Sequence, residues 1–234
     1  MQWRDVLRQC MPWFQVCYYQ PNKSFLVYNN CLRLSILNRN NKADYLEELI
    51  KERRNTKFFK NKLIDKQLLL KVIEMGIWAP NHRMTEPWTF VVVSKGSEER
   101  EKIGNQIEKL ANTLALNKNK ETVKKSAKKA RMDFTNCPCI VYVFSKTGKN
   151  EEETTENFSS VSISIQNMSL FAWSVGIGVG WSTGKTVKVS NLYNILGVPK
   201  SSKIVGCLSM GYIIKKPEIL PTRRSSHLDK IIWK

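Results

Sequence analysis

The sequence predicts an α+β or α/β sandwich, in which helices cover a central sheet. Two observations predict this class: short β-branched and aromatic segments alternate along the chain with longer amphipathic segments, and the composition is rich enough in apolar groups to bury a core. Hydrophobic residues make up 42% of the 234 positions, and the chain contains seven Trp and nine Phe. Such a composition excludes disorder as a description of the whole chain.

The regular pattern begins at Asp44. An amphipathic segment over Asp44–Arg53 predicts a first helix, and Asp65 is a natural N-cap for a second helix that Pro80 brings to an end. Ser159–Val175 is apolar on nearly every face, which predicts a buried central helix. Two further helices are expected at Ser97–Leu116 and near Val189–Leu196. Strands are expected at Trp88–Ser94, Cys139–Ser145, Gly178–Ser182 and Lys203–Ile213.

Residues 1–43 differ from the rest of the chain. They show no helical or alternating period, and they carry six basic residues against a single acid, Asp5. They lack the continuous apolar core and the small-residue cleavage site of a signal peptide. We interpret residues 1–43 as an N-terminal appendage to one domain over residues 44–234.

The charge of the chain is unusual. Thirty-eight Lys and Arg against 20 Asp and Glu give a formal net charge of +18. This balance favours an anionic partner, such as nucleic acid, a membrane surface or a phosphorylated cofactor, without choosing among them. No apolar run reaches the roughly 18 residues that a spanning helix requires, so an integral membrane protein is not expected.

The six Cys do not form a metal or disulfide pattern. They lie at positions 10, 17, 31, 137, 139 and 207, and no pair has the CxxC spacing of a zinc ribbon or a thioredoxin-type site. We therefore expect no metal site. Reduced thiols also favour a cytoplasmic protein.

Three motifs resemble sites that bind phosphate or nucleic acid, but each has a simpler structural interpretation. Gly176, Gly178 and Gly180 follow a helix and open a strand, the reverse of a dinucleotide fingerprint, so close packing is the favoured interpretation. Gly184-Lys185-Thr186 lacks the first glycine of a P-loop, because position 179 is Val. The basic run 118–131 could contact nucleic acid, but its helical spacing favours a solvated helix face.

Separated segments carry a stronger signal when they are taken together. They are Arg53-Arg54-Asn55-Thr56-Lys57-Phe58, the stretch from Ala79 to Trp88, Gln166-Asn167-Met168, Gly180-Trp181-Ser182-Thr183-Gly184, and Arg223-Arg224. In this order and at these separations, they resemble the FMN-dependent nitroreductase family, and in particular its small, minimal branch. The resemblance covers about residues 44–234.

The resemblance implies an α+β fold, a nitroreductase-like α/β sandwich with a central mixed sheet flanked by helices. It also implies an intertwined homodimer that holds one FMN at each of two interfaces. Arg53, Asn55 and Lys57, beside Arg54, match the family's opening motif for the FMN phosphate and pyrimidine edge. Asn55 departs from the family's usual Ser. The other matches are Trp78, Pro80 and His82, which reach the flavin of the partner subunit, Trp181, Ser182 and Thr183 beside the flavin, and Arg223 or Arg224 at the phosphate.

The chemistry of FMN agrees with these residue types. Its phosphate carries a charge of about −1.5 to −2 and requires Arg, Lys or N–H donors. Reduction places negative charge near N1 and O2 of the flavin, where Lys57 or Arg53 could supply a cation. No catalytic acid or base is required, because the flavin carries the chemistry.

Three functions remain in competition. The leading one is an NAD(P)H-dependent FMN oxidoreductase that reduces nitroaromatics, quinones or related acceptors by a ping-pong hydride relay. The second is a specialised flavin enzyme of the same fold, such as a dehalogenase, in which the 96–131 insert would cap the substrate. The third, from another class, is a basic nucleic-acid-binding protein that uses the 118–131 run and the appendage.

Overall fold

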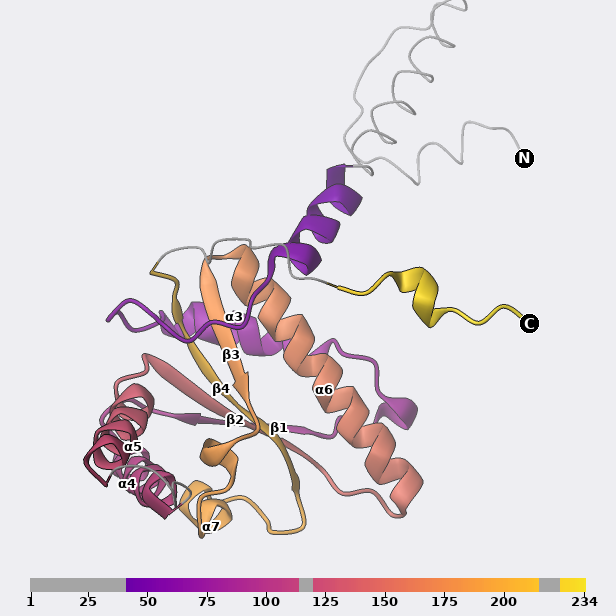
Figure 1. The fold of residues 1–234 in the computed structure, drawn as a ribbon. Coiled ribbons are helices and arrows are strands. Elements are labelled where there is room, and N and C mark those ends of the chain that lie inside the picture. Colours follow the sequence, from indigo (N-terminus) through magenta and orange to yellow (C-terminus); the bar gives the residue numbers. More distant parts are fainter. Residues whose placement is uncertain (1–40, 114–119, 215–223) are drawn as a thin grey trace, which may run out of the picture. The chain divides into compact units, whose positions relative to one another are not determined.

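The computed structural model describes residues 41–113, 120–214 and 224–234, and Figure 1 shows their elements. The chain divides into two compact units, Met1–Glu48 and Leu49–Lys234. Residues 41–52 are helical, as predicted from the pattern that begins at Asp44. The predicted appendage lies outside the described residues up to position 40, so its boundary at residue 43 stays a prediction.

A four-stranded sheet forms the centre of the second unit, with the strand order β1-β2-β4-β3. The strands are Trp88–Val93 (β1), Cys139–Ser145 (β2), Ile177–Ser182 (β3) and Lys203–Tyr212 (β4). All three pairs of neighbouring strands are antiparallel. An isolated parallel bridge joins Asn55 to Val179 of β3. The α+β class is confirmed, but the four described strands form an antiparallel sheet rather than the mixed sheet that the resemblance implied, and the parallel pairing found among the described residues is this isolated bridge.

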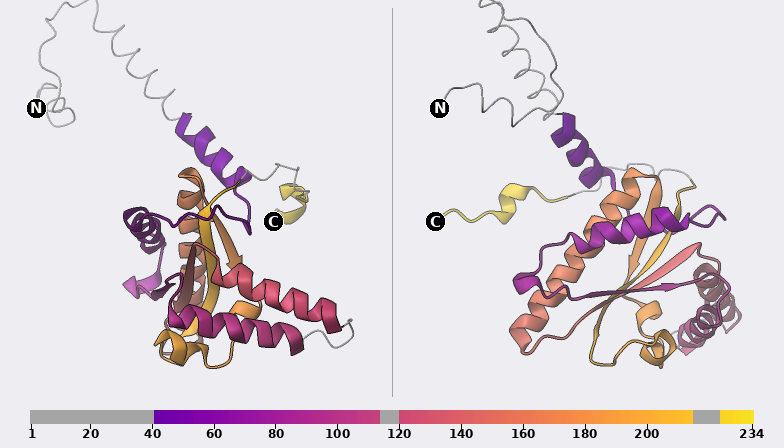
Figure 2. Two further views of the ribbon diagram at one scale, coloured as in Figure 1. Left: turned by 90° about the vertical axis from the view of Figure 1, so that its left-hand side faces the viewer. Right: turned by 180° about the vertical axis from the view of Figure 1, so that it is seen from behind.

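Helices cover both faces of the sheet (Figure 2). One face packs against α3 (Lys66–Ile77) and α6 (Glu151–Ser174), and the other packs against α4 (Glu98–Thr113), α5 (Lys120–Thr135) and α7 (Leu192–Leu196). The predicted N-cap of α3 is confirmed, because the Asp65 carboxylate accepts from the backbone N–H groups of Gln67 and Leu68. Within the described residues, no helix combines the length and the hydropathy that a membrane span needs.

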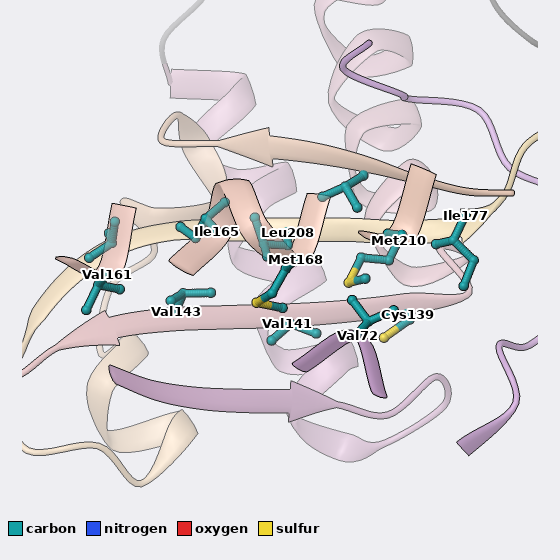
Figure 3. Close-up of a cluster of buried hydrophobic side chains, with 13 residues drawn as sticks. Val72, Cys139, Val141, Val143, Val161, Ile165, Met168, Ile177, Leu208 and Met210 are labelled. Carbon is teal, nitrogen blue, oxygen red and sulfur yellow. The ribbon is translucent and has the colours of Figure 1, made fainter. Parts of the chain in front are cut away.

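The central strand β2 is buried on both faces, and its side chains alternate between two cores. Val141 and Val143 join the cluster beneath α3 and α6, which Figure 3 shows. Ile140, Tyr142 and Phe144 point to the opposite cluster with α4 and α7. A strand that contacts helices on both sides reads as a continuous apolar run, and the sequence Cys-Ile-Val-Tyr-Val-Phe has this form.

The prediction for the central helix was right in position and wrong in burial. Val161, Ile165 and Met168 are fully buried against the sheet. Phe158 and Ile163, on other faces of the same helix, keep 41% and 42% of their surface exposed. The sequence between them also contains serines, so α6 in the single chain has one buried face rather than an apolar surface all round.

Candidate functional site

A polar cavity of about 290 Å³ lies where an extended segment, the helix α6 and the strand β3 meet. The segment contributes two side chains, the helix contributes two, and β3 with the residue after it contributes three. These lining residues are Arg53, Asn55, Gln166, Ser169, Val179, Trp181 and Thr183. We call this space the Arg53 cavity.

The segment that carries Arg53 and Asn55 is fixed along the edge of β3. The Thr56 N–H donates to the Val179 carbonyl at 3.1 Å, and the Trp181 N–H donates to Asn55 Oδ1 at 2.9 Å. Gly180 permits this close approach, since a Cβ atom there would lie 2.4 Å from the Thr56 carbonyl oxygen. The glycines of β3 therefore serve close packing, as the sequence favoured, and they position the cavity wall.

Arg53 brings a half-buried cation to the cavity. Its Nε is buried and has no hydrogen-bond partner among the described residues. Burial lowers the pKa of the Arg53 guanidinium, and the neighbouring charges of Arg54 and Arg224 lower it further. A buried donor without a partner costs free energy, which an anionic or carbonyl group in the cavity would recover. This side chain therefore fits an anionic ligand such as the phosphate or the carbonyl edge of FMN.

The oxygen and the NH₂ group of the Asn55 side chain have different surroundings. Its side-chain oxygen must face the Trp181 N–H, because only the oxygen of an amide accepts. This leaves the amide NH₂ of Asn55, which has no hydrogen bond within the described residues, as a donor at the cavity. The replacement of the family's usual Ser by Asn thus retains a hydrogen-bonding group at this position.

Three of the predicted site residues lie beside the Arg53 cavity but do not line it. Arg54 donates to backbone carbonyls of its own segment, including that of Arg53 at 3.1 Å. Ser182 accepts from the Thr186 hydroxyl at 3.2 Å, on the side of the short 3₁₀ helix Lys185–Val187. Lys57 lines a second cavity, described below.

Of the predicted cross-subunit residues Trp78, Pro80 and His82, none lines the Arg53 cavity, and His82 contacts α6 near its start. His82 Nδ1 lies 2.9 Å from Glu156 Oε2, and the Thr85 hydroxyl donates to Asn157 Oδ1 at 2.8 Å. Pro80 is exposed, and Trp78 keeps 74% of its surface exposed. Within one chain these residues therefore face solvent.

The loop that follows His82 holds a strained backbone. Arg83, Met84 and Glu86 have φ values of 54°, 53° and 41°, in the left-handed region that non-glycine residues rarely adopt. Strain of this kind persists where the surrounding structure enforces it, often at functional sites. Of the predicted C-terminal pair, Arg224 is exposed, and Arg223 lies outside the described residues.

The prediction of site residues missed the contribution of α6. Gln166 and Ser169 line the Arg53 cavity from this helix, and the Ser169 hydroxyl donates to the Ile165 carbonyl at 2.7 Å. Their spacing of i and i+3 places them on one face of the helix. Gln166 belongs to a segment that carries the family resemblance, so that segment was the available signal.

The family model described as "Nitroreductase family" matches residues 50–212. The chain belongs to the nitroreductase family. This confirms the family and the fold that the separated segments indicated. The matched range contains every lining residue of the Arg53 cavity.

Named relatives of two kinds are similar to this chain. A Bacillus subtilis protein named "Putative NAD(P)H nitroreductase YfhC" is 29% identical over 178 residues, which cover 74% of this chain and 87% of that protein. Human iodotyrosine deiodinase 1 is 26% identical over 194 residues, which cover 79% of this chain and 66% of that protein.

Solved structures share the fold. The nitroreductase-like family protein of Bacillus cereus superimposes with a TM-score of 0.67 at 26% identity, over 81% of this chain and 95% of the other. The FMN- and NADPH-dependent nitroreductase NfnB of sphigopyxis sp. strain HMH superimposes with a TM-score of 0.63 at 13% identity, over 81% and 98%. At 13% identity, the similarity to NfnB shows a shared fold and nothing more.

Proposed function

We propose that this chain is an FMN-dependent oxidoreductase that passes a hydride from NAD(P)H to nitroaromatic, quinone or related acceptors. The observation that carries the proposal is the Arg53 cavity, a polar space lined by a half-buried arginine whose Nε has no hydrogen-bond partner among the described residues, in a chain of the nitroreductase family. The relatives named as NAD(P)H nitroreductases support the nucleotide as electron donor.

The residues present fit the proposed cofactor. Arg53 offers a cation to a phosphate or to the electron-rich pyrimidine edge, and Asn55 and Gln166 offer amide donors to carbonyl oxygens. Bound FMN would supply the group that accepts and returns the hydride. The chain itself would hold this group through these side chains, and Arg53 would place positive charge near it, where reduction would make the cofactor more negative.

We further propose a homodimer whose sites are shared between subunits. The exposed apolar side chains of a single chain support this, since Trp78, Met84 and Phe158 keep 74%, 75% and 41% of their surface exposed. Large apolar and aromatic side chains left exposed in one chain are typical of a subunit interface. Trp78, Pro80 and His82 would then approach the FMN that the partner binds.

Mixing two inactive variants tests the shared site. Arg53→Ala and His82→Ala, each weak in FMN binding alone, should partly recover FMN binding when they are unfolded together and refolded. The mixed dimer would then contain one intact site and one site that lacks both residues. An active, FMN-loaded monomer in light scattering would contradict the shared-site proposal.

The activity is tested by mixing the purified holoprotein with NADH or NADPH under argon. The visible absorbance of the flavin should bleach, and addition of a nitroaromatic or a quinone should restore it. A flavin that stays oxidised at saturating concentrations of both nucleotides would refute the proposed electron donor. The preferred acceptor follows from the rate of recovery with each compound.

A dehalogenase-like enzyme is the second candidate, favoured by the similarity to iodotyrosine deiodinase 1. Two electrons from NAD(P)H would replace the carbon–iodine bond of iodotyrosine by carbon–hydrogen and release iodide. Iodide release from iodotyrosine, at a rate above that of nitroaromatic reduction, would favour this candidate over the first.

We also propose a cytoplasmic location, because Cys137, Cys139 and Cys207 are free thiols.

A further inference from the structure

A second cavity, of about 420 Å³, lies between the segment after Asn55 and the basic helix α5. Four lysines line it: Lys57 from the segment, and Lys125, Lys128 and Lys129 from α5. One carboxylate, that of Asp133, lines it with them. We call this space the lysine cavity. Its side-chain charges sum to +3, from four lysines and one aspartate.

Two of these lysines have no acidic partner in the part of the chain that the structure describes. Lys129 pairs with Asp133 at 3.1 Å, and Lys125 pairs with Glu121 at 2.9 Å. Among the described residues, no carboxylate lies within salt-bridge distance of Lys57 or Lys128. The electrostatic potential of the cavity is therefore positive after the internal pairs are counted.

A buried arginine adds positive charge behind the cavity wall. Arg100 is fully buried, and its Nη2 donates to the carbonyl of Cys137, a lining residue, at 2.7 Å. Among the described residues, its Nε and Nη1 have no hydrogen-bond partner, and no carboxylate pairs with it. The guanidinium also lies over the ring of Phe134, with its carbon 5.2 Å from the ring centroid. Because charge is poorly screened in the interior, Arg100 strengthens the potential at the wall.

Apolar side chains form the other part of the lining. Phe58, Met132 and Ile214 face the cavity and keep 69%, 49% and 59% of their surface exposed. Apolar surface beside unpaired cations suits a molecule with both an anionic group and an apolar body. The volume lies in the usual range of small-molecule pockets, of about 300–1,000 Å³.

We propose that the lysine cavity binds a small amphipathic anion, an organic carboxylate, sulfonate or phosphate with an aromatic or aliphatic body. The lysine cavity shares no lining residue with the Arg53 cavity. Nucleic acid fits less well, since its phosphates would use the whole exposed face of α5 and would leave the apolar lining uncovered. The basic run that sequence analysis assigned to solvation thus has a local function where it borders the cavity.

The chain offers a matched pair of variants for the test. Lys128 lines the cavity, whereas Lys124 lies on the same helix, is also exposed and does not line it. Lys128→Glu and Lys124→Glu therefore change the net charge identically. Circular dichroism and flavin content of the purified proteins verify that both variants fold.

Calorimetric titration with anilinonaphthalene sulfonate, an aromatic sulfonate, measures the proposed binding. Lys128→Glu should weaken the probe about tenfold, and Lys124→Glu should leave its Kd within about twofold. Met132→Ser should weaken the sulfonate but leave inorganic phosphate unchanged, because phosphate has no apolar body. Three results would overturn the proposal. The first two are equal weakening of the probe by both glutamate variants and no weakening by either. The third is competition between duplex DNA and the probe that Lys124→Glu abolishes as fully as Lys128→Glu does.

Discussion

The crossing of the Arg53 segment over β3 depends on two glycines, and replacing each one tests this arrangement. A Cβ atom at Gly178 would lie 2.6 Å from Cβ, Cγ2 and Oγ1 of Thr56, all side-chain atoms. A Cβ atom at Gly180 would lie 2.4 Å from the Thr56 carbonyl oxygen, a backbone atom. The first clash can be removed by shortening Thr56, and the second cannot.

The expected losses of stability follow from these contacts. Gly178→Ala overpacks a side chain, which typically costs about 1–3 kcal/mol. Gly180→Ala displaces the backbone as well, and endangers the bonds from the Thr56 N–H to Val179 and from the Trp181 N–H to Asn55, each worth about 0.5–1.5 kcal/mol. We therefore expect about 2–6 kcal/mol for Gly180→Ala, with loss of FMN affinity because Asn55 moves.

Urea denaturation of the single and double variants measures both effects. Thr56→Gly should rescue Gly178→Ala, giving a favourable coupling in the double-mutant cycle, and should leave the loss in Gly180→Ala unrelieved. A Gly180→Ala protein with unchanged stability and unchanged FMN affinity would refute the role of close packing at this edge. Equal rescue of both variants would show that the clash at Gly180 does not involve the backbone.

Three further predictions concern the cation, the appendage and the buried thiols. Arg53→Ala should weaken FMN binding by about 1.5–3 kcal/mol through the loss of a charge-assisted contact, and unchanged retention in a fluorescence titration would refute the cavity assignment. Deletion of residues 1–43 should leave a folded, flavin-bound and active dimer in gel filtration and NAD(P)H oxidation assays, and loss of flavin would show that these residues belong to the site. Burial raises the pKa of the Cys207 thiol to about 12, from 9.0. The unfolded chain therefore releases this proton first, so stability should fall between about pH 9 and pH 12, and Cys207→Ala should flatten that decline by about 1.4 kcal/mol per pH unit in urea titrations.

The strands and the core could be predicted from the sequence because their signal is local. β2 is a continuous apolar run, and Asp65 is followed by helical spacing, so both elements appear where the pattern places them. The exposed face of α6 could not be predicted, because helix periodicity does not show whether a second surface covers Phe158 and Ile163. That covering depends on tertiary or quaternary packing.

The positions of the site residues also depend partly on long-range pairing and partly on local structure. Arg53, Asn55, Trp181 and Thr183 meet at one cavity because a segment far away in the sequence pairs with β3, and the resemblance carried this long-range information. The hydrophobic periodicity of the sequence does not indicate such a pairing. The departure of Ser182 from the cavity is a local effect, since successive residues of a strand point to opposite faces.

The central claim is that the Arg53 cavity holds FMN, and the flavin content of the purified protein tests it most directly. The protein should be yellow, and denaturation should release FMN in a ratio of about one per chain, as identified by chromatography against FMN and FAD standards. Arg53→Ala should be purified with less flavin than the parent protein. Release of FAD, or a colourless protein that binds no FMN on titration, would contradict the account.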